Sequence, residues 1–119
     1  MNVIIFSGRL AAAPDVHEHG ETTVARFRLI RNEYAGKDSD GSAKERTVSA
    51  QFSAFNRKAE AIAKNAMVGD QLIVHASIRN NNFKDSEGRD RYEYSFEVEH
   101  FEFGAPGQAK REKLASSGS

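Results

Sequence analysis

Five stretches of the chain alternate apolar with polar residues, and this period of two limits the possible folds more than any other feature. They cover residues 2–10, 22–34, 45–55, 71–83 and 89–103. Such alternation is typical of strands that bury one face and expose the other. In the second stretch Ala25, Phe27 and Leu29 therefore share one face, and Arg26 and Arg28 share the opposite face.

The other stretches extend this assignment of faces. The third is predicted to bury Val48, Ala50, Phe52 and Ala54 and to expose Ser49, Gln51, Ser53 and Phe55. The fourth is predicted to bury Leu72, Val74, Ala76 and Ile78. In the fifth, one face holds Tyr92, Tyr94, Phe96 and Val98, and the other holds Glu93, Glu97 and Glu99. We expect these glutamates to form a solvated surface that repels phosphate.

One segment between the third and fourth stretches has helical spacing instead. Asn56 stands where a capping residue is expected, and Gly69 stands where a helix would end. The apolar residues between them recur at the period of a helix: Ala59, Ile62, Ala63, Ala66 and Met67. We therefore predict one helix after Asn56.

Three strands, one helix and two strands are the order of an OB-fold, an all-β, five-stranded Greek-key barrel with antiparallel strands. An SH3-like barrel has no such helix, and a ferredoxin-like fold has two. The 119 residues suit one domain, which we place at residues 1–103. Residues 104–119 are low in apolar content and are predicted to form a flexible tail.

Two connections read as loops. Residues 35–44 (AGKDSDGSAK) predict a mobile arm between the second and third strands. Residues 84–89 (KDSEGR) predict a tighter turn, in which Gly88 takes a positive φ.

Composition excludes several classes of function. The chain has no cysteine, which rules out disulfides, thiolate zinc sites and thiol nucleophiles. No run approaches the roughly 20 apolar residues of a membrane span, and no basic segment starts a signal peptide, so we expect a cytoplasmic protein. Lys and Arg number 17, as do Asp and Glu. Because the net charge is zero, any nucleic-acid site must come from local clustering of cations.

We expect no enzyme activity, cofactor or metal. His17 and His19 alternate as metal ligands on a strand would, but HEHG, which ends at Gly20, reads as a solvated turn and no third ligand is evident. The sequence has no nucleotide-binding glycine loop and no nucleophile elbow.

Aromatic and cationic residues, together with one amide, form a cluster on the outward face of the second and third predicted strands. Its members are Arg26, Arg28, Tyr34, Gln51 and Phe55. An outward phenyl ring at a strand end is unfavourable unless something covers it. A stacked nucleobase would cover Phe55. The alternative is that Phe55 packs under a loop or against another subunit.

Further candidates follow along the chain. Arg57 stands at the start of the predicted helix, where cations oppose the helix dipole but can attract phosphate. The last hairpin supplies Arg79, Asn81, Phe83, Lys84 and Arg91. Rings for stacking beside cations are what sequence-tolerant binding of a single strand requires. Taken alone, the asparagines also fit a plain hairpin bend.

Four longer motifs cover much of residues 2–103: VIIFSGRLAAAPDV, VARFRLIRNEY, AFNRKAEAIAKNAMVGDQLIVHASI and FKDSEGRDRYEY. Through these motifs, residues 2–103 resemble the bacterial single-stranded DNA-binding protein family. The resemblance implies that Phe55 and Phe83 stack bases. A stacking tryptophan of the family falls at Ser49, and another falls next to Tyr34, so this chain has fewer and smaller rings.

The resemblance also implies assembly into dimers or tetramers, with outward Ile5 and Ile73 as candidates for the contact surface. Housekeeping members of the family end in an acidic tip that recruits replication and repair enzymes, whereas this sequence ends in KREKLASSGS. From the resemblance and the clusters of rings and cations, we expect a protein that binds single-stranded DNA in replication, recombination or repair. The open alternatives are a primosomal accessory protein that docks other proteins and an assembly subunit with no nucleic-acid role.

Overall fold

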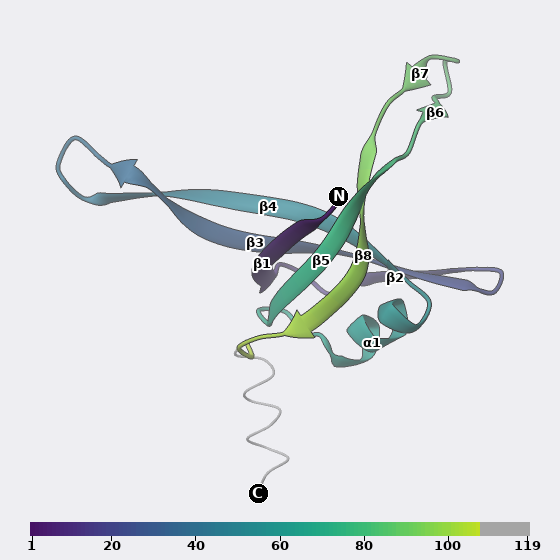
Figure 1. Cartoon of the computed structure of the whole chain (residues 1–119), viewed down its shortest axis with the longest axis horizontal. Coiled ribbons are helices and arrows are strands. Elements are labelled where there is room, and N and C mark those ends of the chain that lie inside the picture. Colours follow the sequence, from purple (N-terminus) through teal and green to yellow (C-terminus); the bar gives the residue numbers. More distant parts are fainter. Residues whose placement is uncertain (108–119) are drawn as a thin grey trace, which may run out of the picture.

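The computed structural model describes residues 1–107, which form a small barrel with three projecting hairpins (Figure 1). The elements in chain order are β1 (Ile4–Leu10), β2 (Asp15–His19), β3 (Thr22–Lys37), β4 (Ala43–Phe55), α1 (Arg57–Asn65), β5 (Gln71–Asn80), β6 (Phe83–Lys84), β7 (Asp90–Arg91) and β8 (Tyr94–Phe103). Within these residues no helix is long and apolar enough to cross a membrane.

Six strands form one sheet in the order β1-β5-β8-β4-β3-β2, and a further pairing of β1 with β3 closes it into a barrel. The five strands of this barrel and the helix after β4 confirm the predicted OB-fold order. The prediction that every strand is antiparallel was wrong at one pair, because β4 and β8 run parallel.

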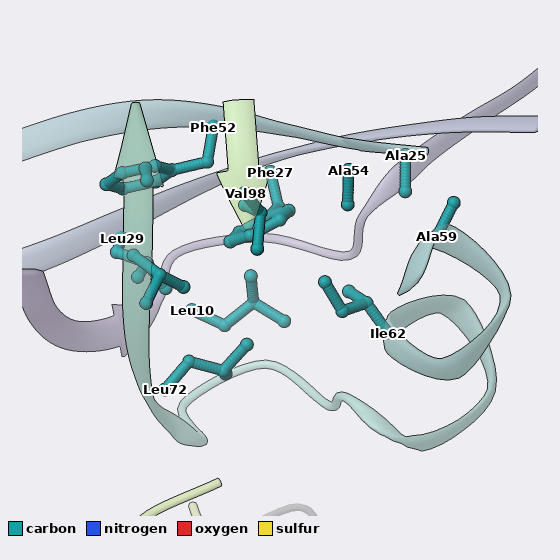
Figure 2. Close-up of a cluster of buried hydrophobic side chains, with 12 residues drawn as sticks. Leu10, Ala25, Phe27, Leu29, Phe52, Ala54, Ala59, Ile62, Leu72 and Val98 are labelled. Carbon is teal, nitrogen blue, oxygen red and sulfur yellow. The ribbon is translucent and has the colours of Figure 1, made fainter. Parts of the chain in front are cut away.

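The barrel interior is built from the faces that alternation assigned to it. Phe27 and Phe52 are buried with ring centroids 5.8 Å apart, and Ala59 and Ile62 of α1 complete the same cluster (Figure 2). Replacing a buried ring such as Phe52 with a methyl group costs about 3–5 kcal/mol. Phe52 is therefore a main support of the barrel that carries the outer face.

Asn56 occupies the predicted N-cap position, but its side chain does not cap the helix. Asn56 has a φ of 54° and makes no side-chain cap hydrogen bond. Instead its backbone N–H donates to the Thr23 carbonyl at 2.8 Å, and its Oδ1 accepts from the Thr23 N–H at 3.3 Å. These bonds to β3 compete with capping and hold Asn56 against the sheet. The helix also ends earlier than predicted, since Ala66 is already extended.

The histidine segment was predicted as a turn, but it is strand β2. Its residues pair with β3 from Asp15 opposite Arg26 to His19 opposite Thr22, and Gly20 has the positive φ of 62° that the following turn requires. Only polar residues flank Val16 in this strand, so alternation gave no signal for it.

Pairing also shortens the predicted loop at residues 35–44. β3 continues to Lys37 and β4 begins at Ala43, with an irregularity in the register between Tyr34 and Lys37. The predicted turn at Gly88 is confirmed, with a φ of 78°.

The predicted strands at residues 71–83 and 89–103 extend beyond the barrel where they approach the hairpin that joins them. Tyr92 and Tyr94 are each 73% exposed, although Phe96 and Val98 of the same parity contribute to the core. Ile78 was predicted to be buried and is exposed as well. Beyond the barrel wall the alternating parity no longer determines burial, because no opposite wall covers the inner face.

Residues 104–107 lie against the start of β5. The buried carboxylate of Asp70 accepts hydrogen bonds from the Met67 N–H at 2.9 Å and the Gly107 N–H at 2.8 Å. A Cβ on Gly107 would lie 2.5 Å from the Gly69 carbonyl carbon, so only glycine fits there. The domain boundary at residue 103 stays a prediction, and most of the predicted tail (108–119) lies outside the described residues.

Candidate nucleic-acid interface

The outward side chains of β3 and β4 form a continuous surface, which we call the β3–β4 face. Its rows follow from the strand register: Arg26 lies opposite Ser53, Arg28 opposite Gln51 and Ile30 opposite Ser49. Arg26, Arg28 and Gln51 are all exposed, as predicted. Within residues 1–107 neither arginine forms an ion pair, so both guanidinium groups are available to a ligand.

Phe55 ends this face at the point where β4 passes into α1. It is 37% exposed and lies opposite Val24, whose other neighbour in the sheet is His17 of β2. His17 and His19 project on the same side as Phe55, with ring centroids 6.3 Å apart. This row of rings was missed at the sequence level because β2 was not recognised as a strand.

The Asp15 carboxylate, which lies beside Arg26 in the register, contacts His17 Nε2 at 3.1 Å. No group of three or more potential metal ligands occurs among the residues that the structure describes.

Tyr34 lies farther out on the same face. It is 66% exposed and pairs with Glu45 near the tip of the β3–β4 hairpin. Six residues of extended chain separate it from Arg28, a distance of about 20 Å. The structure therefore places Tyr34 on the β3–β4 face but at the far end from Phe55.

The β6–β7 hairpin carries the second exposed phenylalanine. Phe83 is 43% exposed and lies opposite Arg91, and Lys84 lies opposite Asp90. Arg91 is engaged within the hairpin, because its Nε lies 2.9 Å from Asp85 Oδ2. Lys84 forms no ion pair in the described part of the chain.

Asp85 organises the turn of this hairpin. Its Oδ1 accepts hydrogen bonds from the N–H groups of Arg89 at 3.0 Å and Glu87 at 2.9 Å. The Arg89 N–H, the Arg91 side chain and the Glu87 N–H together hold the pKa of Asp85 below its ordinary value. The ionised carboxylate therefore holds the turn between β6 and β7.

Arg79 was predicted to bind nucleic acid, but it is occupied by acidic neighbours. Its Nε lies 3.2 Å from Glu97 Oε2, and one Nη lies 3.4 Å from Glu99 Oε1. Glu99 also accepts a 2.8 Å hydrogen bond from the Ser77 hydroxyl, which with Arg79 lowers the pKa of this carboxyl. The charge of Arg79 is largely compensated.

Arg57 is the first residue of α1 and is exposed, directly after Phe55 and Asn56. Asn81 is exposed at the base of the β6–β7 hairpin, where its N–H donates to the Glu93 carbonyl at 2.8 Å. The structure thus brings Arg26, Arg28, Gln51 and Phe55 together, with Asn81 beside them, while Phe83 and Lys84 stand on a separate hairpin.

Comparison with known proteins agrees with this geometry. The profile of the Single-strand binding protein family matches residues 1–104. The chain belongs to this family. This confirms the resemblance predicted from the sequence.

One curated relative within the family is a Single-stranded DNA-binding protein of Xylella fastidiosa. It is 29% identical over 93 residues, which cover 77% of this chain and 56% of the relative. The chain therefore spans about half the length of the curated relative that it matches.

Solved structures of single-stranded DNA-binding proteins share the fold. A deletion mutant of the Thermus aquaticus protein superimposes with a TM-score of 0.74 at 16% identity, covering 87% of this chain and 50% of that one. The Plasmodium falciparum protein in complex with single-stranded DNA gives 0.71 at 17% identity, covering 87% and 95%. At these identities the likeness establishes the fold alone.

Proposed function

We propose that this chain binds single-stranded DNA, with little dependence on base sequence, along the β3–β4 face and the β6–β7 hairpin. One observation carries the proposal. Arg26 and Arg28 lie on one outward face without acidic partners in residues 1–107, and the exposed ring of Phe55 ends that face. Cations hold the sugar-phosphate backbone, and rings stack on the bases whatever their identity.

Each predicted site residue has a role in this account. Phe55, Phe83 and Tyr34 provide faces for stacking, because each exposes a large part of its ring. Arg57 and Lys84 attract phosphates, and the amides of Gln51 and Asn81 form hydrogen bonds to sugar or base.

Arg79 and Arg91 contribute less than the uncompensated cations. Arg79 is shared between Glu97 and Glu99, and Arg91 is paired with Asp85. A phosphate that approached either arginine would have to compete with these carboxylates. Arg79 instead ties β5 to β8, and Arg91 helps to hold the β6–β7 hairpin.

We place the protein in replication, recombination or repair, in the cytoplasm at the nucleoid, with no catalytic step. It assembles with copies of itself through the outward face of β1 and β5. Ile5 is 64% exposed there and pairs with His75, and Ile73 lies in the next row of that face. Apolar side chains on an open face support a partner that covers them.

The test is a titration of labelled dT oligomers of increasing length at two salt concentrations, followed by anisotropy and combined with light scattering for mass. Affinity is expected to fall with salt, with a log–log slope of about −0.7 per neutralised phosphate. An absence of binding at low salt would overturn the function, and binding insensitive to salt would overturn the role of the arginines.

A further inference from the structure

A small pocket opens where β4 and β8 stop pairing. These parallel strands are joined only at Phe52 with Phe96 and at Ser53 with Glu97. Before these rows β8 arrives from the β6–β7 hairpin, so the two strands diverge. The pocket between them has a volume of about 210 Å³ and includes Arg26, Gln51, Asn81, Glu93 and Tyr94 in its lining. We call it the β4–β8 notch.

The notch continues the β3–β4 face. Arg26 lies opposite Ser53, which also lines the notch, and Gln51 is the outward residue before it on β4. On the other side of the notch lies Tyr94, which is 73% exposed. A single strand that crosses Arg28 and Arg26 therefore passes over this opening.

Two opposite charges line the notch without neutralising each other. Across residues 1–107 neither Arg26 nor Glu93 takes part in an ion pair. The Asn81 N–H donates to the Glu93 carbonyl at 2.8 Å, which fixes the Glu93 backbone at the rim. By contrast, Glu97 and Glu99 farther along β8 are held by Arg79.

A carboxylate in the path of a nucleic acid selects what can approach it. It repels phosphate, whereas it accepts hydrogen bonds from N–H groups on a base edge. Guanine offers two adjacent donors, N1–H and N2–H, which match the two oxygens of a carboxylate. It also offers two adjacent acceptors, O6 and N7, which match a guanidinium. No other DNA base satisfies both groups in this way.

We propose that the β4–β8 notch is a guanine subsite within the single-stranded DNA path. Glu93 accepts hydrogen bonds from guanine N1–H and N2–H, and Arg26 donates to O6 and N7. This inference rests on the proposed function, because it requires a strand lying on the β3–β4 face. The subsite adds a preference at one position of a path that otherwise tolerates any base.

The experiment compares the full chain on dT oligomers that carry one central dG, dC, dA or deoxyinosine, with plain dT as reference. A single guanine avoids self-association of the oligomer. The dG oligomer is expected to bind about tenfold more tightly than plain dT, the size of one bidentate base contact. Deoxyinosine, which lacks the N2 amino group, is expected to lose most of this gain.

Glu93→Gln removes one of the carboxylate acceptors and the negative charge. It is expected to abolish the dG preference and to strengthen binding to plain dT. Glu60→Gln on the exposed side of α1 removes the same charge away from the notch and is expected to keep the preference.

The outcomes separate the two proposals. Equal binding of all oligomers, a preference for dC or dA, or a dG preference that survives Glu93→Gln would each overturn the guanine subsite while leaving single-strand binding in place. Failure of the parent chain to bind any oligomer would overturn both.

Discussion

At the scale of single residues, the cations of this protein differ in what they are free to do. Arg28 projects from the β3–β4 face, and no acidic group pairs with it within residues 1–107. Arg79 has the same formal charge but contacts two glutamates. The availability of a cation, rather than its presence in the sequence, determines its share of phosphate binding.

The first prediction contrasts these two positions. Arg28→Ala is expected to weaken dT binding and to reduce the steepness of the salt dependence by about 0.7, the contribution of one phosphate contact. Arg79→Ala is expected to change the slope less, because its charge is already compensated by Glu97 and Glu99. Anisotropy titrations over a range of salt concentrations measure both slopes. Equal losses of slope in the two variants would refute the distinction.

The sequence predicted correctly which face a side chain takes where alternation along the strand alone decides it. Arg26 and Phe27 were assigned to opposite faces, and the structure has one exposed and the other buried. The pairing of Arg79 with Glu97 and Glu99 could not be foreseen in the same way. It depends on the register between β5 and β8, which includes an irregularity between His75 and Ala76.

At the scale of elements, the β6–β7 hairpin depends on one carboxylate. Asp85 binds the N–H groups of Glu87 and Arg89 and the side chain of Arg91, and its pKa is lowered. A lowered pKa in the folded state means that the ionised form stabilises the turn. This contribution is present above the unfolded pKa of about 4 and is lost as the pH falls through the folded value.

The second prediction follows from this sign. The cross-strand NMR contact between Phe83 and Arg91 is expected to persist from pH 7 to pH 5 and to weaken as the pH falls below about 4. Asp85→Ala is expected to weaken the contact already at pH 7. Asp90→Ala on the same hairpin serves as the control and is expected to retain it. An Asp85→Ala hairpin with an unchanged contact would show that Asp85 does not hold the turn.

Features that depend on tertiary contacts could not be predicted from the sequence. Strand β2 is polar and short, and it exists because β3 offers it a partner along five residue pairs. Asn56 was placed as a cap from its residue type, yet its bonds to Thr23 hold it in another role. The β4–β8 notch likewise arises from the point at which two strands separate, for which the sequence carries no local pattern.

At the scale of the whole molecule, binding must come from arrangement and not from net charge. Lys and Arg equal Asp and Glu at 17 each, so the average surface does not attract a polyanion. The fold instead leaves some cations without an ion-pair partner among the described residues. Arg26 and Arg28 lie on the β3–β4 face, whereas the glutamates of β8 are largely paired with Arg79.

The exposed rings and residues 104–107 lie in different parts of the molecule. The exposed rings lie on the β3–β4 face and the β6–β7 hairpin, while residues 104–107 are held at Asp70 beside the start of β5 (Figure 1). The described chain therefore ends beside the start of β5, away from the tip of the β6–β7 hairpin (Figure 1).

The claim that bases stack on exposed phenyl rings is tested most directly by removing those rings. Phe55→Ala and Phe83→Ala are each expected to weaken binding of a dT oligomer by about 1–3 kcal/mol while the fold persists. Phe103→Ala is the matched control, because Phe103 is similarly exposed, at 38%, but lies outside the proposed binding surface. It is at the end of β8, opposite Leu72 of β5. We expect losses of affinity for the first two variants and none for the third. Unchanged affinity in Phe55→Ala and Phe83→Ala would contradict stacking on these rings.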